Sequence, residues 1–304
     1  MIQFKNLKEL MTKLADEQVC RQHIEEMRWG GEPFCPHCGS TKPYKLKDGK
    51  TYRCKDKTCK RDFTVTVGTI FENSKIPLST WMAAIFILTG HKKGISSLQL
   101  ARDLGVTQKT AWFMNHRIRL IMGEPTPPPL DNIVEIDETY VGGKFANMNR
   151  GRRKKLQEQG IDNKVAVMGL LERDGKARLT VIGGNTFKDV VRDNVKKTAV
   201  VVTDTHLSYV GLAQEYASHL SVNHSKSEYR NGLAFTNSVE GFFSCLKRSI
   251  YGIYHSVSPK HIHRYCEETS YRFNTRQIKD ADRFTRTLQN VEGRLKYKNL
   301  IKKL

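Results

Sequence analysis

Four of the seven cysteines are spaced as ligands of a single metal ion. Two residues separate Cys35 from Cys38, four separate Cys54 from Cys59, and fifteen lie between the two pairs. Short turns of this kind each present two thiolates, and four thiolates complete the tetrahedral shell of a structural Zn²⁺. The spacing therefore predicts a zinc ribbon whose one zinc has no open position for chemistry. The alternative interpretation is a set of unrelated thiols or disulfides.

Three acidic residues further along the chain are candidates for a second metal site. Asp137 lies within an alternating stretch predicted as a strand over 132–141, and Asp204 ends an apolar strand predicted over 199–204. A carboxylate withdrawn from water needs a cation or hydrogen-bond donors, so the pair suggests a shared divalent metal. Glu240 lies on a predicted helix over 236–252, away from its apolar stripe, and is able to point toward the aspartates. Taken singly, each acid is also compatible with a solvated surface charge.

The elements that must position these acids alternate between strand and helix. Two further strands, 164–172 and 177–184, are predicted to form a hairpin, and a helix over 186–197 precedes the strand that ends at Asp204. Three antiparallel strands followed by a helix, a parallel strand and more helices are the order expected for a ribonuclease-H-like sheet.

A helix-turn-helix is predicted between the zinc ribbon and this sheet. An apolar helix over 77–90 is followed by helices over 96–105 and 107–122, with a glycine at the joint. The second helix of such a motif enters the major groove of DNA. A helical hairpin with a solvated charged face is the alternative. The second helix, over 107–122, carries five residues predicted to contact DNA: Gln108, Lys109, Asn115, Arg117 and Arg119.

The charge of the chain favours a polyanionic partner. Lys and Arg number 51 against 31 Asp and Glu, which gives a formal charge of +20 and argues against a small neutral-substrate enzyme. Basic residues gather at 41–61, 144–155 and 283–303. The insert 144–155 is predicted to be a mobile loop that clamps DNA, or else a disordered loop that only raises solubility. Further candidate DNA contacts are Arg150, Arg152 and Arg153 in this insert and Lys247 and Arg248 on the helix that carries Glu240.

The chain is predicted to be a multidomain α+β protein that works in the cytoplasm. Its longest apolar run has eight residues, too few to cross a membrane, and its first residues do not resemble a secretion signal. Four of the nine prolines lie in 123–130 and predict a stiff linker. The predicted parts are an N-terminal helical segment (1–30), the zinc ribbon (31–72), the helix-turn-helix (73–122), the linker (123–130), the ribonuclease-H-like catalytic domain (131–280) and a basic C-terminal tail (281–304).

Four motifs carry a resemblance to a known family. They are DETYVGGK (137–144), TDTHLSY (203–209), VNHS (222–225) with the EYRNG that follows, and TNSVEGFFSCLKRSIYGIYH (236–255). Behind a zinc ribbon and a helix-turn-helix, they resemble the zinc-ribbon DDE transposases of bacterial insertion sequences related to the Merlin elements. The resemblance covers nearly the whole chain. One departure is Phe235, where His is expected in many relatives.

The resemblance implies a DNA transposase that binds terminal inverted repeats, cleaves at transposon ends and joins the 3′-hydroxyl to target DNA. Asp137, Asp204 and Glu240 would hold two Mg²⁺ ions, with Mn²⁺ as a substitute, and Asp137 would bridge the two. Asn237 and His224 would support the site. A homodimer or higher oligomer on double-stranded DNA is expected. Two alternatives remain open: a metal-dependent nuclease or resolvase, and a catalytically silent DNA-binding regulator.

Overall fold

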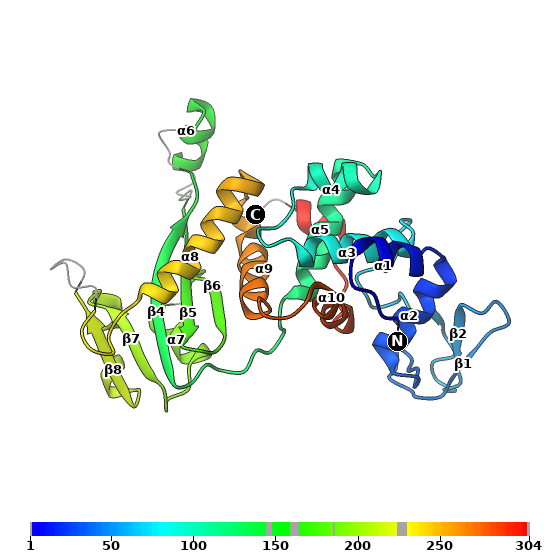
Figure 1. Cartoon of the computed structure of the whole chain (residues 1–304), viewed down its shortest axis with the longest axis horizontal. Coiled ribbons are helices and arrows are strands. Elements are labelled where there is room, and N and C mark those ends of the chain that lie inside the picture. The colour runs from blue at the N-terminus through cyan, green and yellow to red at the C-terminus, as the bar shows by residue number, and fades with distance from the viewer. Residues whose placement is uncertain (1, 144–147, 159–163, 185, 224–229, 303–304) are drawn as a thin grey trace. The chain divides into compact units, whose positions relative to one another are not determined.

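The computed structural model of the chain describes residues 2–143, 148–158, 164–184, 186–223 and 230–302 (Figure 1). Two compact units make up the chain, and each has its own core. Unit 1 combines Met1–Met122 with Gln277–Leu304, and unit 2 is the continuous segment Gly123–Arg276. Within the described residues, no helix is both long enough and apolar enough to span a membrane.

The N-terminal part of unit 1 contains the predicted zinc ribbon. Helices α1 (Leu7–Lys13) and α2 (Glu17–Trp29) precede an antiparallel sheet of β1 (Pro43–Lys45), β2 (Thr51–Cys54) and β3 (Asp62–Thr64). Helix α2 ends at Trp29 and is capped by Gly30, whose φ of 57° is left-handed, a conformation that costs glycine little. Trp29, at the end of α2, packs edge-on against Tyr52 of β2, with ring centroids 5.1 Å apart. This small aromatic contact ties the ribbon to the helix before it.

A helical core forms the rest of unit 1. Helix α3 (Leu78–Gly90) is buried over almost its whole surface, which explains its nearly unbroken apolar sequence. Helices α4 (Ser97–Leu104) and α5 (Gln108–Met122) pack against each other, and α4 ends at Gly105 with a φ of 65°. The hydroxyl of Thr107 accepts a hydrogen bond from the N–H of Thr110 and caps the start of α5.

The C-terminal segment is part of this core, so its prediction as a basic tail is corrected. Helix α10 (Asp280–Gln289) packs against α3, and α11 (Tyr297–Ile301) follows it. Phe284 and Leu288 are fully buried, and Arg283 donates a hydrogen bond to the carbonyl of Thr89. The apolar residues of the segment recur at helical spacing, but the abundance of Lys and Arg obscured that pattern.

Unit 2 is built on the predicted mixed sheet. The strand order is β6-β5-β4-β7-β8, with β4 antiparallel to β5 and parallel to β7. The connection from β6 to β7 passes through α7 (Phe187–Asn194). The order agrees with a ribonuclease-H-like sheet, and β8 is a strand that the sequence pattern did not indicate. The strands are β4 (Ile133–Val141), β5 (Val165–Glu172), β6 (Ala177–Val181), β7 (Val200–Asp204) and β8 (Ser218–Val222).

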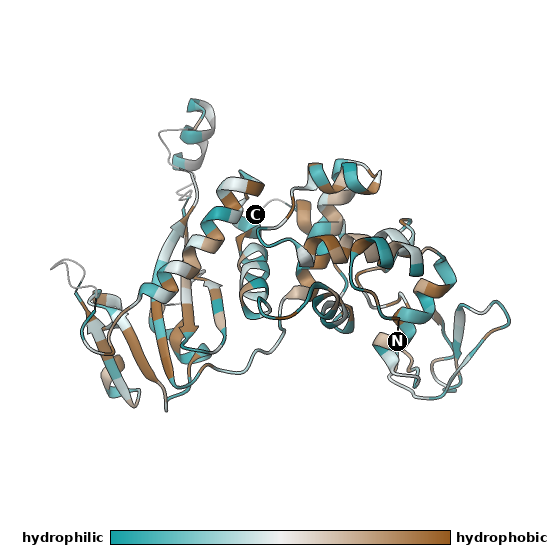
Figure 2. Cartoon of the chain, viewed as in Figure 1, coloured by the Kyte–Doolittle hydropathy of each residue, from teal (hydrophilic) through white to brown (hydrophobic). Residues whose placement is uncertain are grey.

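Helices cover the two faces of this sheet separately. Val134 and Ile136 of β4 point toward α7 and pack with its Val190 and Val191. The opposite face is covered by α8 (Asn237–Ser249) and α9 (Ile262–Asn274). Figure 1 shows α8 crossing in front of the strands. Figure 2 shows that apolar residues concentrate on the strands between these layers. Residues of β4 therefore alternate between an α7 face and an α8 face.

The basic insert after β4 contains a helix where a loop was predicted. Helix α6 (Arg150–Glu158) begins within the insert, and Figure 1 shows it beyond the end of the sheet. Lys154 lies 3.8 Å from Glu158 one turn later, an exposed pair of the kind that supports isolated helices. Residues 144–147 and 159–163 lie outside the described part of the chain.

Candidate functional site

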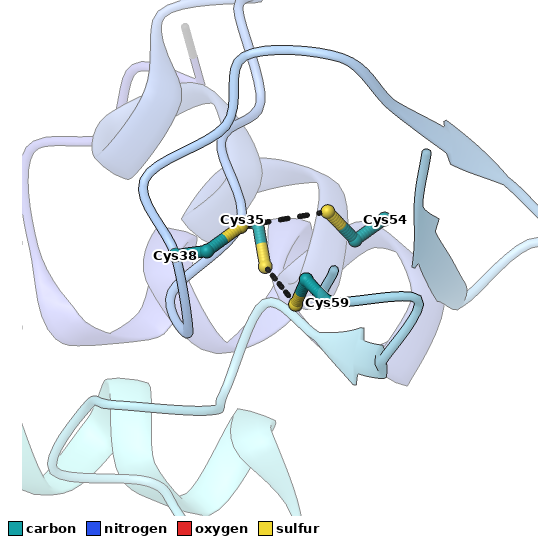
Figure 3. A group of neighbouring side chains, drawn as sticks. All are labelled: Cys35, Cys38, Cys54 and Cys59. Carbon is teal, nitrogen blue, oxygen red and sulfur yellow. Dashed lines mark hydrogen bonds between the residues drawn. The ribbon is translucent and has the colours of Figure 1, made fainter. Parts of the chain in front are cut away.

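The four predicted zinc ligands converge in unit 1. Figure 3 shows their sulfur atoms turned toward one another, and all four lie within 4.8 Å of each other. Cys35 and Cys38 come from the turn after α2, Cys54 ends β2, and Cys59 lies in the turn before β3. The sulfur atoms of Cys38 and Cys54 are 3.6 Å apart and those of Cys35 and Cys59 are 3.8 Å apart.

These separations fit a tetrahedral metal. Four sulfur atoms at about 2.3 Å from a central Zn²⁺ stand about 3.8 Å from one another. A disulfide would bring two sulfur atoms to about 2.05 Å, far closer than the contacts in this cluster. The cluster thus has the composition and the spacing of a structural zinc site, as the sequence predicted.

Asp137 and Asp204 lie on the same face of the sheet in unit 2. The parallel strands β4 and β7 pair Ile133 with Val200 and Glu135 with Val202. The same register continued by two residues places Asp137 opposite Asp204. Because Val134 and Ile136 face α7, both aspartates face the layer that contains α8.

The environment of Asp137 disfavours its charged form. Burial raises the pKa of Asp137 to about 6, and the negative charges of Glu138, Asp204 and Glu240 act in the same direction. A hydrogen bond from the N–H of Glu138 to Oδ1 of Asp137, 2.8 Å long, acts against this shift. A half-buried carboxylate that senses three other acids has the electrostatic character of a cation ligand. The oxygen donors of these acids suit Mg²⁺ or Mn²⁺.

Glu240 lies on the first turn of α8, the helix that covers this face of the sheet. Its side chain is exposed and accepts a hydrogen bond of 3.4 Å from the hydroxyl of Thr236. Helix α8 approaches β5 closely at Gly169, the residue that pairs with Asp137. A Cβ atom at Gly169 would lie 2.7 Å from carbon atoms of both Val239 and Phe243. The missing side chain at Gly169 therefore sets how near α8 comes to the strand of Asp137.

Replacing Gly169 by Ala is expected to push α8 outward. An overpacked contact of this kind costs about 1–3 kcal/mol in the free energy of unfolding. Binding of divalent metal by the acids should fall further than this destabilisation explains, because Glu240 moves with the helix. Urea denaturation and Mn²⁺ titration calorimetry of the variant measure the two effects. A matched Gly183→Ala change, where a new Cβ meets nothing within 4 Å, should alter neither quantity.

A buried ion pair beside the acids was not identified from the sequence. Glu135 is fully buried on the same face of β4 as Asp137, and Nε of Arg173 donates to its Oε1 over 2.7 Å. The carboxylate of Glu135 also accepts from the backbone N–H groups of Ser238 and Val239 at the start of α8. The available signal was an acidic residue between the apolar residues Val134 and Ile136, two positions before Asp137.

The structure describes one of the two predicted auxiliary residues. Asn237 is the exposed first residue of α8, and His224 lies outside the described residues. Phe235, the departure from the family pattern, packs its ring against the guanidinium of Arg173, whose central carbon is 3.5 Å from the ring centroid. The aromatic ring at this position thus contacts the buried ion pair.

Three predicted DNA contacts on α5 are corrected by the structure. Asn115 and Arg119 are each 1% exposed and Arg117 is 5% exposed, so none of them is available to DNA in this fold. Arg117 donates to the carbonyl oxygens of Ile70 and Leu295, and its charged end thereby joins α5 to two other segments of unit 1. The burial arises because the C-terminal segment returns to this part of the chain.

Other predicted DNA contacts are on the surface. Gln108 and Lys109 are exposed in the first turn of α5, the part of a recognition helix that meets base edges. Arg150 on α6 and Arg248 on α8 are exposed. Arg153 and Lys247 are partly buried, and the side chain of Arg152 lies outside the described part.

Comparisons with known proteins give matches for the segment that contains the cysteine cluster and for the segment that contains the three acids. Residues 129–274 match the model of an ISXO2-like transposase domain, and residues 15–62 match that of a transposase zinc-ribbon domain. An uncharacterized protein in transposable element ISH50 of Halobacterium salinarum is 27% identical over 249 residues, 77% of this chain and 83% of that protein. An uncharacterized transposase-like protein of Haemophilus influenzae is 30% identical over 94 residues, 31% of this chain and 75% of that protein.

Proposed function

Because the chain belongs to the IS1595 family of transposases, we propose that it binds the terminal inverted repeats of a transposon, cleaves at their ends and joins the freed 3′-hydroxyl to target DNA. The observation that carries the proposal is the shared face of Asp137 and Asp204, with Glu240 on the helix that covers it. The likeness of the motifs to Merlin-related elements points the same way.

Asp137, Asp204 and Glu240 would hold divalent metal at this face. Bound Mg²⁺, or Mn²⁺ in its place, would activate the attacking oxygen and stabilise the leaving oxygen of the phosphodiester. The protein would contribute three carboxylates, carried by two strands and a helix. The raised pKa of Asp137, caused first by burial and then by neighbouring acids, supports this role, because a bound cation would stabilise the charged form of the carboxylate.

Double-stranded DNA, both transposon ends and target, is the proposed partner. The charge of +20 supplies a general attraction for phosphates. The exposed first turn of α5, with Gln108 and Lys109, is the proposed base-reading surface, and α6 with Lys247 and Arg248 is the proposed phosphate-binding surface. Two ends must be cut together, so we propose at least a dimer on DNA.

The experiment that tests the function incubates the purified protein with transposon-end DNA, a target plasmid and Mg²⁺. The expected product is end DNA joined covalently to the plasmid. Cleavage without joining would instead favour a nuclease or resolvase. Binding of the ends without any metal-dependent cut would favour a catalytically silent regulator.

Neutralising the basic residues of α6 is expected to flatten the salt dependence of DNA binding. Changing Arg150, Arg152, Arg153 and Lys154 to Gln should reduce the slope of log K against log salt by about 0.9 for each phosphate that the protein no longer neutralises. Fluorescence anisotropy with labelled end DNA between low and high salt measures this slope. The control changes Arg192, Lys196 and Lys197 to Gln. These side chains are already paired with Glu215 and Asp131, so their replacement should leave the slope unchanged. An unchanged slope in the α6 variant would remove this segment from the DNA-binding surface.

A further inference from the structure

We propose that Glu135 and Arg173 form a positioning pair, which holds the first turn of α8 against β4 and thereby sets the place of Glu240 beside Asp137 and Asp204. The inference rests on the proposed function of these three acids as metal ligands. It assigns no contact with metal or DNA to the pair itself.

Glu135 binds the start of α8 from the sheet. Its carboxylate accepts hydrogen bonds from the backbone N–H of Ser238 at 3.0 Å, the hydroxyl of Ser238 at 3.1 Å and the backbone N–H of Val239 at 3.2 Å. Together with the bond from Arg173, four donors occupy its two oxygens. These contacts leave Glu135 poorly suited to be a further metal ligand, although it lies two residues from Asp137 on the same face.

Helix α8 depends on this carboxylate because its own cap is incomplete. Thr236 occupies the N-cap position, but its side chain makes no capping hydrogen bond. The first N–H groups of a helix have no partner within the helix and carry the positive end of its dipole. Glu135, which lies on strand β4, supplies the negatively charged acceptor that a capping residue would normally provide.

Arg173 completes the connection from the end of β5. Nη2 of Arg173 donates to the carbonyl of Phe235 over 3.0 Å, and its guanidinium lies against the ring of the same residue. The backbone N–H of Arg173 donates to the carbonyl of Ile133 on β4. One arginine thus joins both strands to the residues just before α8. Glu135 is fully buried. Removing the charge of Arg173 would therefore leave a buried carboxylate without its partner, which is destabilising.

The pair converts a fixed strand spacing into a fixed position for Glu240. Glu135 and Asp137 lie on the same face of β4, and Glu240 lies in the same first turn of α8 as Ser238 and Val239. The hydrogen bonds between Glu135 and Ser238 therefore link the two elements directly beside the two acids. If this link loosens, Glu240 samples more positions and the three carboxylates meet a shared cation less often.

The test compares metal-free and Mn²⁺-loaded full-length protein without DNA. Glu135→Gln is expected to weaken Mn²⁺ binding at the acidic site by about tenfold or more, measured by titration calorimetry on zinc-loaded protein. Backbone amide exchange in peptides covering 236–242 should become faster. Arg173→Lys keeps the charge but not the forked donors, and should give an intermediate effect on both. The matched control is Glu268→Gln, which breaks a buried pair with Arg272 within α9. It should lower the melting temperature and leave both readouts unchanged.

Folded Glu135→Gln protein with wild-type Mn²⁺ affinity and wild-type exchange would overturn the inference. If that variant does not fold, the milder Arg173→Lys decides by the same two readouts. A failure of the proposed function looks different. In that case the wild-type protein binds no Mn²⁺ at Asp137, while amide exchange at the start of α8 still reports whether Glu135 and Arg173 anchor the helix.

Discussion

Replacing Asp137 by Asn is expected to lower the rate of DNA cleavage by at least about 1,000-fold, equivalent to about 4 kcal/mol of lost transition-state stabilisation. Asn has nearly the same size as Asp but no negative charge, so the site would lose its central acid without a change in packing. Binding of end DNA should be unaffected. Single-turnover cleavage of labelled end DNA in Mg²⁺ measures the rate, and anisotropy measures the binding.

The neighbouring acid on the same strand provides the control. Glu138 lies on the α7 face of β4, where its carboxylate accepts a hydrogen bond of 2.6 Å from the hydroxyl of Tyr209. Glu138→Gln should therefore cleave at a rate close to that of the wild type. Cleavage by Asp137→Asn at the same rate would show that this carboxylate takes no part in the chemistry.

Replacing Cys38 by Ser is expected to remove the zinc and unfold the ribbon. The strands of the ribbon have only three or four residues each, too few to form a stable core without the metal. Structural zinc contributes about 10–16 kcal/mol to the folding of such modules at neutral pH. Limited proteolysis should then cut within 31–72, and specific binding of end DNA should be lost.

Metal analysis of the purified protein measures this directly. Wild-type protein should contain one zinc per chain, and Cys38→Ser should contain almost none. Cys245→Ser, which changes a partly exposed thiol outside the cluster, should retain the full amount. Full zinc content in Cys38→Ser would contradict four-thiolate coordination.

Features encoded by local patterns were predictable from the sequence. The zinc cluster follows from two short turns, each of which presents two thiols whatever the rest of the chain does. The strands β4, β5, β6 and β7 of unit 2 were predicted from alternating and continuous apolar runs, which report how many faces of a strand are buried. Asp137 and Asp204 were chosen as candidate ligands because each lies at a definite position in such a strand.

Features that depend on distant parts of the chain were not predictable. Arg117 looked like a DNA contact because its helix is basic, but its partner carbonyl belongs to Leu295, 178 residues later. The role of Glu135 likewise depends on Arg173 and on Ser238, 38 and 103 residues away. A single sequence contains no record of which segments pack together over such separations. Arg117 was therefore predicted to contact DNA, and Glu135 was not identified as a residue of interest.

A crystal structure of the protein with Mn²⁺ and transposon-end DNA would show whether Asp137, Asp204 and Glu240 share divalent metal, as we propose. Anomalous scattering identifies Mn²⁺ by a signal that the lighter atoms of the protein do not give. We expect anomalous density among the three carboxylates, with oxygen-to-metal distances of about 2.1 Å or slightly longer. Fully occupied Mn²⁺ elsewhere on the protein, with no density between these acids, would contradict the proposal.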